Sequence, residues 1–345
     1  MKLLRKILYP FSILYGAITS ARNYLYSKNI LKSAKFEIPT IVVGNLSVGG
    51  TGKTPQIEYL IRLLQNQYNV AVLSRGYKRK SKGFIIADEN ASAELIGDEP
   101  FQYYQKFKNI IVCVDADRVN AIQQLQKLAN PPQVILLDDA FQHRKVAGGF
   151  NILLTPYNDL YINDTMLPTG NLREKVSGAD RANLIIVSKC PSIISEEEQF
   201  EITKKLTPTL YQTVFFTSIN YENELQGFSK VNLLEPENAE VLLVTGIAKP
   251  DPLLNYLKEI NIKFEHLKYA DHYHFNSKDL IEINKRYNSL KAKNKILLTT
   301  EKDYVRIFDK LKNLNYISIK TKFINHKNDF DNIIKTYVEQ SSRNS

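Results

Sequence analysis

The chain has 345 residues, 43% of them hydrophobic, so it can bury a substantial core and is long enough for two domains. Its only cysteines, Cys113 and Cys190, are too few for a disulfide framework and do not resemble a metal cluster, which favours a reducing compartment. The net charge is +10, but residues 1–36 carry seven basic and no acidic side chains, which leaves about +3 elsewhere and argues against a nucleic-acid partner.

The N-terminal segment, residues 1–34, has the pattern of an amphipathic helix. Lys2, Arg5 and Lys6 lie off its apolar face, and no run approaches the ~20 apolar residues that a membrane span requires. Pro10 interrupts the strongest apolar stretch. We therefore expect the helix to lie on an anionic membrane surface. The alternatives are a helix packed on the protein's own core and a secretory signal. The apolar face comprises Leu4, Ile7, Leu8, Phe11, Leu14, Tyr15 and Ile18.

Past residue 36, short apolar runs alternate with amphipathic stretches. The spacing of apolar residues indicates helices over 54–68 and 116–129. A strand followed by a helix, repeated along the chain, is typical of a parallel sheet covered by helices on both faces. The expected strands are Thr40–Val43, Val70–Leu73, Phe84–Ala87, Ile110–Val114, Val134–Leu137, Ile152–Leu154 and Leu184–Val187.

A second series of strands and helices begins near Val241, after the polar stretch 233–240. It predicts a smaller α/β domain over 233–339, after a larger domain over 35–232. The last residues, 340–345, are polar, and we expect them to be disordered. The expected elements of the smaller domain are strands at 241–246, 263–269, 295–300 and 316–319 and helices at 251–261 and 277–291.

The sequence SVGGTGKT follows the first expected strand and resembles the phosphate-binding loop G-x-x-x-x-G-K-[ST], with Ser47 at the first glycine position. Its glycines allow a tight turn whose backbone N–H groups converge on phosphate oxygens. Lys53 would neutralise the β- and γ-phosphates of ATP, and the Thr54 hydroxyl would bind Mg²⁺. A glycine-rich turn without a ligand is the alternative. The predicted nucleotide-binding residues are Ser47, Val48, Gly49, Gly50, Thr51, Gly52, Lys53 and Thr54.

Two adjacent acids, Asp138 and Asp139, follow the apolar run Val134–Leu137. A buried strand delivers such residues to its carboxyl end, where ligands bind in open α/β sheets. There they can hold Mg²⁺ directly or through water. A solvated acidic turn is the alternative.

The loop also raises the possibility of a ParA-like switch ATPase. Those loops read KGGxGK[ST], and this chain has Val48 where their first lysine stands, which disfavours that class. A membrane-bound scaffold with a vestigial nucleotide site is a third hypothesis. A kinase needs further groups that orient and deprotonate an acceptor. The sequences GDEP (97–100), NLRE (171–174) and DHYHF (271–275) are sources of such groups.

Taken together in chain order, the motifs resemble the tetraacyldisaccharide 4'-kinase family, the lipid A 4'-kinases. They are VGNLSVGGTGKTP, SRGY, GDEP, DDAFQHR, LPTGNLRE, DHYHF and TTEKD. The resemblance implies transfer of the ATP γ-phosphate to the 4'-hydroxyl of a tetraacylated glucosamine disaccharide 1-phosphate. It implies an enzyme associated with the cytoplasmic face of the inner membrane of a Gram-negative bacterium, and it implies no protein partner. The fold expected is a P-loop NTPase-type α/β domain, a smaller C-terminal α/β domain and an N-terminal amphipathic helix.

The resemblance also implies roles for individual residues. Asp98 and His272 would form the acid/base pair, in which a carboxylate accepts the hydroxyl proton beside an imidazole. The chain departs from the family at Ala140, Lys175 and Tyr273, so the choice between His272 and His274 stays open. The implied catalytic residues are Asp98, His272 and Lys53, the metal ligands Thr54, Asp138, Asp139 and Glu174, and the substrate-binding residues Arg75, Gln142, His143 and Arg173.

Overall fold

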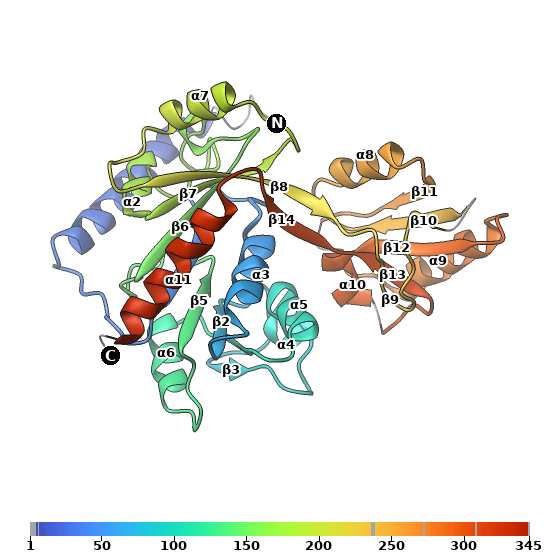
Figure 1. Ribbon diagram of the computed structural model, residues 1–345, viewed down its shortest axis with the longest axis horizontal. Coiled ribbons are helices and arrows are strands. Elements are labelled where there is room, and N and C mark those ends of the chain that lie inside the picture. Colours follow the sequence, from blue (N-terminus) through green and yellow to red (C-terminus); the bar gives the residue numbers. More distant parts are fainter. Residues whose placement is uncertain (1–4, 6, 236–238, 272, 308, 344–345) are drawn as a thin grey trace.

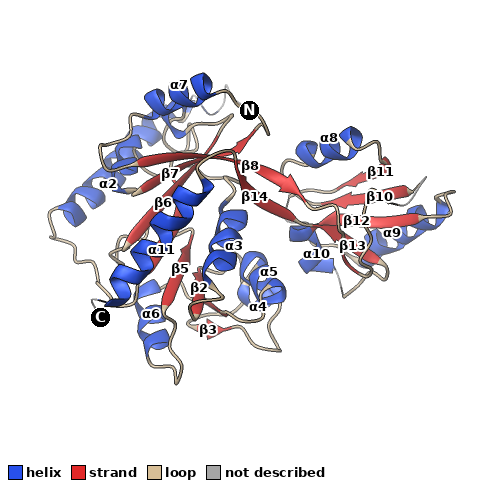
Figure 2. Cartoon of the chain, viewed as in Figure 1, coloured by secondary structure: helices blue, strands red, loops and turns tan. Residues whose placement is uncertain are grey.

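The computed structural model describes residues 5, 7–235, 239–271, 273–307 and 309–343. Within these residues the chain forms two α/β domains, each with its own sheet (Figure 1). Figure 2 shows that helices flank both sheets. The expected α/β class, with a large and mostly parallel sheet, is confirmed.

The larger sheet has nine strands among the described residues, and the first strand of the chain lies at its centre. Most neighbouring strands are parallel, and an antiparallel pair closes each edge. In spatial order the strands are β14 (Ile319–Phe323), β8 (Thr213–Tyr221), β7 (Leu184–Cys190), β6 (Phe150–Pro156), β1 (Thr40–Asn45), β5 (Val134–Asp138), β2 (Val70–Ser74), β4 (Ile111–Val114) and β3 (Ile85–Ile86).

Helices cover both faces of this sheet because their apolar residues recur at helical spacing. On α3, Ile57, Leu60, Ile61 and Leu64 are fully buried against one face. That face is covered by α3 (Lys53–Leu64), α5 (Asp98–Lys106) and α11 (Lys327–Arg343), and the other by α6 (Arg118–Gln126) and α7 (Glu196–Leu206). Short helical segments are α4 (Ala93–Ile96), η1 (Tyr161–Asn163) and η2 (Val176–Arg181).

The smaller sheet is also covered on both faces. Along β10, Val241 and Leu243 pack into one apolar cluster and Leu242 and Val244 into another, as alternation along a doubly buried strand requires. In spatial order its strands are β11 (Lys263–Lys268), β10 (Glu240–Thr245), β12 (Lys295–Thr300), β13 (Leu314–Ile317) and β9 (Gln226–Gly227). Its helices are α8 (Asp251–Glu259), α9 (Ser277–Ser289) and α10 (Glu301–Ile307).

The end of the chain differs from the expected division. We expected 233–339 to form the smaller domain and 340–345 to be disordered, but β14 pairs with β8 in the larger sheet. The helix α11 then buries Phe330, Ile334 and Val338 against the larger domain and continues to Arg343 (Figure 1). These residues share one helix face, and the apolar surface they cover belongs to the first domain. The chain therefore crosses between the domains twice, along β8 and β14.

The N-terminal helix α2 extends over Tyr9–Ser27. Pro10 lies in its first turn, where a missing N–H breaks no helical hydrogen bond. The helical residues Arg5 and Ile7 are separated from α2 by a turn at Leu8, so the break expected near Pro10 is present. No helix in the described ranges is both long enough and apolar enough to cross a bilayer. The expected apolar face is exposed at Phe11, Leu14 and Ile18, each 58–62% accessible.

Candidate active site

The glycine-rich loop connects β1 to α3 at the carboxyl end of the central strand. Gly49 has φ +118° and Gly52 has φ +87°, values that L side chains rarely adopt, so these positions require glycine. The helix α3 begins at Lys53, one residue before the expected start at Thr54, and the Lys53 ammonium donates to the Asn45 side chain at 3.3 Å. The turn therefore has the strand, loop and helix order of a phosphate-binding loop.

A second segment holds the start of this loop in place. The backbone N–H of Val48 donates to the Asn171 carbonyl at 2.8 Å, and that of Arg173 donates to the Leu46 carbonyl at 2.7 Å. Ser47, at the first glycine position, is buried and forms a bridge with Leu172. The NLRE motif thus serves as the backbone partner of the loop.

The two acids at the end of β5 lie in different environments. Asp138 is 2% exposed and accepts from the Ser74 hydroxyl at 3.1 Å. Burial, and then the charges of Glu99 and Asp139, raise the pKa of Asp138 to about 7. A divalent cation would relieve this destabilisation, so the carboxyl group fits a metal site.

Asp139 lies on the accessible side, in the left-handed region at φ +48°. Burial opposes its ionisation, but the charge of Lys53 and the hydrogen bonds and charge of Arg173 outweigh it and lower its pKa. Its carboxylate lies 3.6 Å from the Lys53 ammonium and 2.8 Å from the Arg173 guanidinium. Asp139 therefore joins the phosphate-binding lysine to the NLRE motif.

Glu174 was expected at the metal, but its carboxylate has other partners. It is 2% exposed and accepts from Asn23 at 2.8 Å, Gln142 at 2.9 Å and Arg181 at 2.9 Å. Three donors satisfy most of the acceptor capacity of this buried carboxylate. Among the described residues, no cluster of three or more His, Cys, Asp or Glu side chains suits a metal ion. The geometry thus brings Asp138 and Asp139 to Lys53 and ties Glu174 to the N-terminal helix.

The four expected substrate residues fall into two groups. Arg173 and Gln142 both donate to the Asn45 carbonyl, at 2.9 and 2.8 Å, so they support the loop. Burial lowers the pKa of His143 to about 4, so its imidazole is neutral at pH 7. Arg75 is exposed and lines a cavity of about 430 Å³ with Lys78, Arg79 and Lys82, among others.

Asp98 begins α5, and the structure connects it to the second domain. The Arg306 guanidinium, on α10, donates to its carboxylate at 2.6 and 3.0 Å. The same guanidinium donates to Asp303 at 3.0 Å. His272 lies outside the described residues, whereas His274 is exposed.

The sequence did not single out Arg306 or Asn45. Arg306 lies three residues beyond the TTEKD motif, and Asn45 stands within the quoted VGNLS, so both were adjacent to a recognised signal. Their contacts depend on segments far away in the chain: Arg306 meets Asp98, and Asn45 meets Arg173. Periodicity and local motifs carry no information on such pairs.

The polar face of α2 packs against this site. Ser12 donates to Thr169 at 2.7 Å, and the Tyr15 hydroxyl donates to the Arg173 carbonyl at 3.0 Å. Arg5, expected among the headgroup-binding cations, donates to Gly170 and Asn171 at 3.1 Å, while Lys2 and Lys6 lie outside the described residues. The exposed apolar face of α2 therefore lies on the side away from these contacts.

Comparisons with known proteins agree with the nucleotide-binding site that the loop predicts. The sequence model of the family described as "Tetraacyldisaccharide-1-P 4'-kinase" matches residues 4–339. A tetraacyldisaccharide 4'-kinase of Flavobacterium johnsoniae is 56% identical over 99% of both chains. One of Bacteroides thetaiotaomicron is 43% identical over 99% of this chain and 95% of its own. The crystal structure of LpxK from Aquifex aeolicus in complex with ATP has a TM-score of 0.77 and 32% identity, and covers 97% of this chain and 99% of that one.

Proposed function

The chain belongs to the tetraacyldisaccharide 4'-kinase family. On this premise we propose that it transfers the γ-phosphate of ATP to the 4'-hydroxyl of a tetraacylated glucosamine disaccharide 1-phosphate. This transfer is a step of lipid A biosynthesis. The observation that carries the proposal is the contact of Asp139 with both Lys53 of the phosphate-binding loop and Arg173, beside a helix with an exposed apolar face. A ParA-like switch ATPase at the membrane would share such a helix, but it needs no acceptor site.

The loop residues 47–54 hold the triphosphate through backbone N–H groups, with Lys53 against the β- and γ-phosphates. The Thr54 hydroxyl and the carboxylates of Asp138 and Asp139 are the residues that would hold Mg²⁺. When bound, the ion offsets phosphate charge during transfer. The resemblance adds Glu174 to these metal ligands; its carboxylate also contacts Gln142 and Asn23, so it connects α2 to the site.

Asp98 is the proton acceptor in this proposal, with His272 as its partner. A carboxylate within hydrogen-bond reach of the 4'-hydroxyl takes its proton as the oxygen attacks the γ-phosphorus, the bond to the bridging oxygen breaks and ADP leaves. In this structure the Arg306 guanidinium donates two hydrogen bonds to the Asp98 carboxylate. That ion pair positions the base at the start of α5 until the acceptor binds.

The basic cavity beside this position suits the acceptor's own phosphate. Its wall includes Arg75, Lys78 and Lys82, which are exposed and have no ion-pair partner in the described part of the chain. The Gly76 backbone packs against that of Gly97, so the cavity adjoins the loop that carries Asp98. An acceptor phosphate held there would orient the sugar towards the catalytic base.

The helix α2 is the proposed membrane contact, at the cytoplasmic face of the inner membrane. Phe11, Leu14 and Ile18 project apolar surface, as does Ile7 just before the helix, while the opposite face contacts the NLRE segment. Insertion of these side chains into the interface would bring the site to lipids that do not leave the bilayer.

Transfer of label from [γ-³²P]ATP tests the function. The wild-type protein is incubated with the disaccharide 1-phosphate lipid, with its 4'-deoxy analogue, or with no lipid. We expect label in the first lipid alone, with little phosphate released. Release of phosphate at the same rate in all three samples would favour a switch ATPase, and nucleotide binding without any turnover would favour a vestigial site.

A further inference from the structure

The carboxyl end of β7 makes two contacts with the phosphate-binding loop that the proposed mechanism has not used. The Ser188 hydroxyl donates to the Thr51 carbonyl at 2.7 Å, and the Lys189 ammonium donates to the Gly50 carbonyl at 2.6 Å. Lys189 has φ +58°, and the pairing of β7 with β8 shifts register between Val187 and Cys190. A left-handed backbone at a residue other than glycine costs about 1 kcal/mol or more, so the fold holds this lysine against the loop at a cost.

The surroundings of Lys189 are positively charged. Its side chain is largely exposed, but protein atoms crowd the ammonium; this loss of water, and then the charges of Lys249 and Lys53, lower its pKa. Lys189 thus lies against the loop that carries Lys53, and Lys249 lies near enough to Lys189 for its charge to act on the ammonium. The phosphate-binding loop itself carries one cation, Lys53, whose charge Asp139 partly neutralises.

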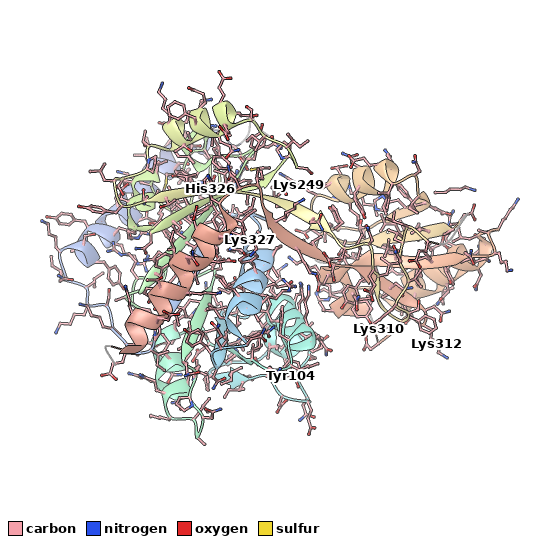
Figure 3. The ribbon with its side chains drawn as sticks, in the orientation of Figure 1. Tyr104, Lys249, Lys310, Lys312, His326 and Lys327 are labelled. Carbon is pink, nitrogen blue, oxygen red and sulfur yellow. The ribbon has the colours of Figure 1, made fainter. Side chains whose placement is uncertain are left out.

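Lys249 comes from the second domain, from the connection between β10 and α8. Figure 3 shows it between the two domains, whereas Lys310 and Lys312 lie at the far lower edge of the second domain. Lys249 is exposed, and it makes no ion pair or hydrogen bond with another described residue. Its position therefore contributes nothing evident to the fold, while it adds repulsion to Lys189.

A polyanion at the loop would remove this repulsion. Like charges in close proximity raise the free energy of the protein, and a bound triphosphate places negative charge among all three ammonium groups. We propose that Lys189 and Lys249 bind the polyphosphate chain of the nucleotide, Lys189 from the first domain and Lys249 from the second. The inference rests on the proposed use of ATP at this loop.

The contribution of each lysine depends on the number of phosphates. Lys189 lies against the Gly50 carbonyl, within the loop that surrounds the phosphates. It therefore contacts the phosphates that ATP and ADP share. Lys249 approaches from the opposite domain and meets the terminal phosphate, so it favours ATP over ADP. Neither side chain contributes to the binding of AMP.

Titration of ATP, ADP and AMP with Mg²⁺, followed by calorimetry, tests the proposal on the full chain. Lys249→Met should weaken ATP binding about 5- to 10-fold, ADP binding less and AMP binding not at all. Lys189→Met should weaken ATP and ADP binding to similar extents, and Lys189→Arg should restore part of both. In steady-state assays the KM for ATP should rise more than kcat falls. Lys312→Met, an exposed lysine of the second domain, is the matched control and should leave all three affinities unchanged.

Unchanged ATP binding in Lys249→Met, or an equal loss for ATP, ADP and AMP, would overturn the assignment. If Lys189→Met does not fold, as thermal unfolding would show, Lys249→Met and Lys189→Arg still decide it. Lys53→Met separates the two hypotheses: if that variant binds ATP as tightly as the wild type, the proposed function itself fails, whatever the two other lysines do.

Discussion

At the scale of single residues, Asp139 connects the phosphate-binding lysine to the NLRE motif. Its carboxylate holds both Lys53 and Arg173, and its neighbour Asp138 is buried with a raised pKa. Such a cluster keeps the phosphate-binding lysine at the mouth of the loop before the nucleotide arrives. Preorganised charge of this kind lowers the cost of orienting groups during transfer.

Removal of the phosphate-binding groups should nearly abolish turnover. In Lys53→Ala the charge that compensates the phosphates is lost, and in Thr54→Ala a metal ligand is lost. We expect kcat to fall at least about 10²-fold in each variant, measured by transfer of label to the lipid. The unfolding temperature serves as the control for folding. Near-wild-type transfer in both variants would remove the loop from the mechanism.

Loss of the proton acceptor should affect kcat and leave ATP binding nearly unchanged. We expect Asp98→Ala and His272→Ala each to lower kcat by roughly 10²-fold or more, since general-base catalysis is worth about that much. The double variant should lose much less than the product of the single losses, because members of one catalytic unit are non-additive.

His274→Ala is the internal control for this pair, and its effect should be mild. A severe loss at His274 with a mild one at His272 would assign the role to the other histidine. Multiplicative losses at Asp98 and His272 would show that the two residues act separately.

At the scale of elements, the polar and apolar faces of α2 are oriented opposite to those of an ordinary surface helix, whose apolar face packs on the protein. Its polar residues face the protein and hydrogen-bond the NLRE segment, while its large apolar residues face outward. An apolar helix face that no described residue covers marks an interaction surface.

Substitution of this face should release the protein from membranes. Phe11, Leu14 and Ile18, replaced together by serine, should reduce sedimentation with anionic vesicles at least about 10-fold, since each buried apolar side chain contributes ~1.5–3 kcal/mol. The matched control replaces three other exposed apolar residues, Ile193, Leu210 and Tyr211. Equal loss in both variants, or none in the first, would assign the anchor to another surface.

A buried charge cluster joins three helices across the two domains. The Lys106 ammonium, on α5, lies 2.7 Å from Glu58 on α3 and 2.6 Å from Glu301 on α10. Burial and the charge of Glu58 raise the pKa of Glu301 to about 7. A carboxyl whose pKa is raised on folding contributes stability below its unfolded pKa, and that stability is lost as pH rises through the folded value.

The pH dependence of stability should therefore change in Glu301→Gln. Between pH 5 and pH 8 the wild type should lose on the order of 2 kcal/mol of unfolding free energy that the variant retains. Urea unfolding at the two pH values measures the difference. Asp329→Asn, at an exposed ion pair on α11, is the control. Parallel stability curves for wild type and Glu301→Gln would show that Glu301 does not titrate in this range.

At the scale of the whole molecule, the sequence was most informative where structure is local. Each of the seven strands expected in the larger domain exists, since short apolar runs and glycine-rich turns report local structure. The strands β8 and β14 were missed or misassigned, because Thr213–Tyr221 is half exposed and its partner comes from the end of the chain. The position of α11 on the first domain likewise depends on surfaces distant in sequence.

The site shows the same limit. The SVGGTGKT and DDAFQHR sequences located Lys53, Asp138 and Asp139 from local order alone. The resemblance assigns Glu174 to the metal, which stays a prediction, and the structure adds contacts of its carboxylate with Asn23, Gln142 and Arg181 that the sequence did not indicate. The packing of α2 against this part of the protein determines the partners of Glu174, and no spacing of residues in the sequence indicates that packing.

The central claim is that the chain phosphorylates the 4'-oxygen of a lipid and does not merely hydrolyse ATP. Nuclear magnetic resonance of the lipid recovered after reaction with ATP and Mg²⁺ tests it most directly, through ³¹P–¹H correlation. We expect one new phosphomonoester coupled to the proton at the 4' carbon, formed in step with ADP. ADP accumulation with inorganic phosphate and unchanged lipid, or a new phosphate on any other oxygen, would contradict the account.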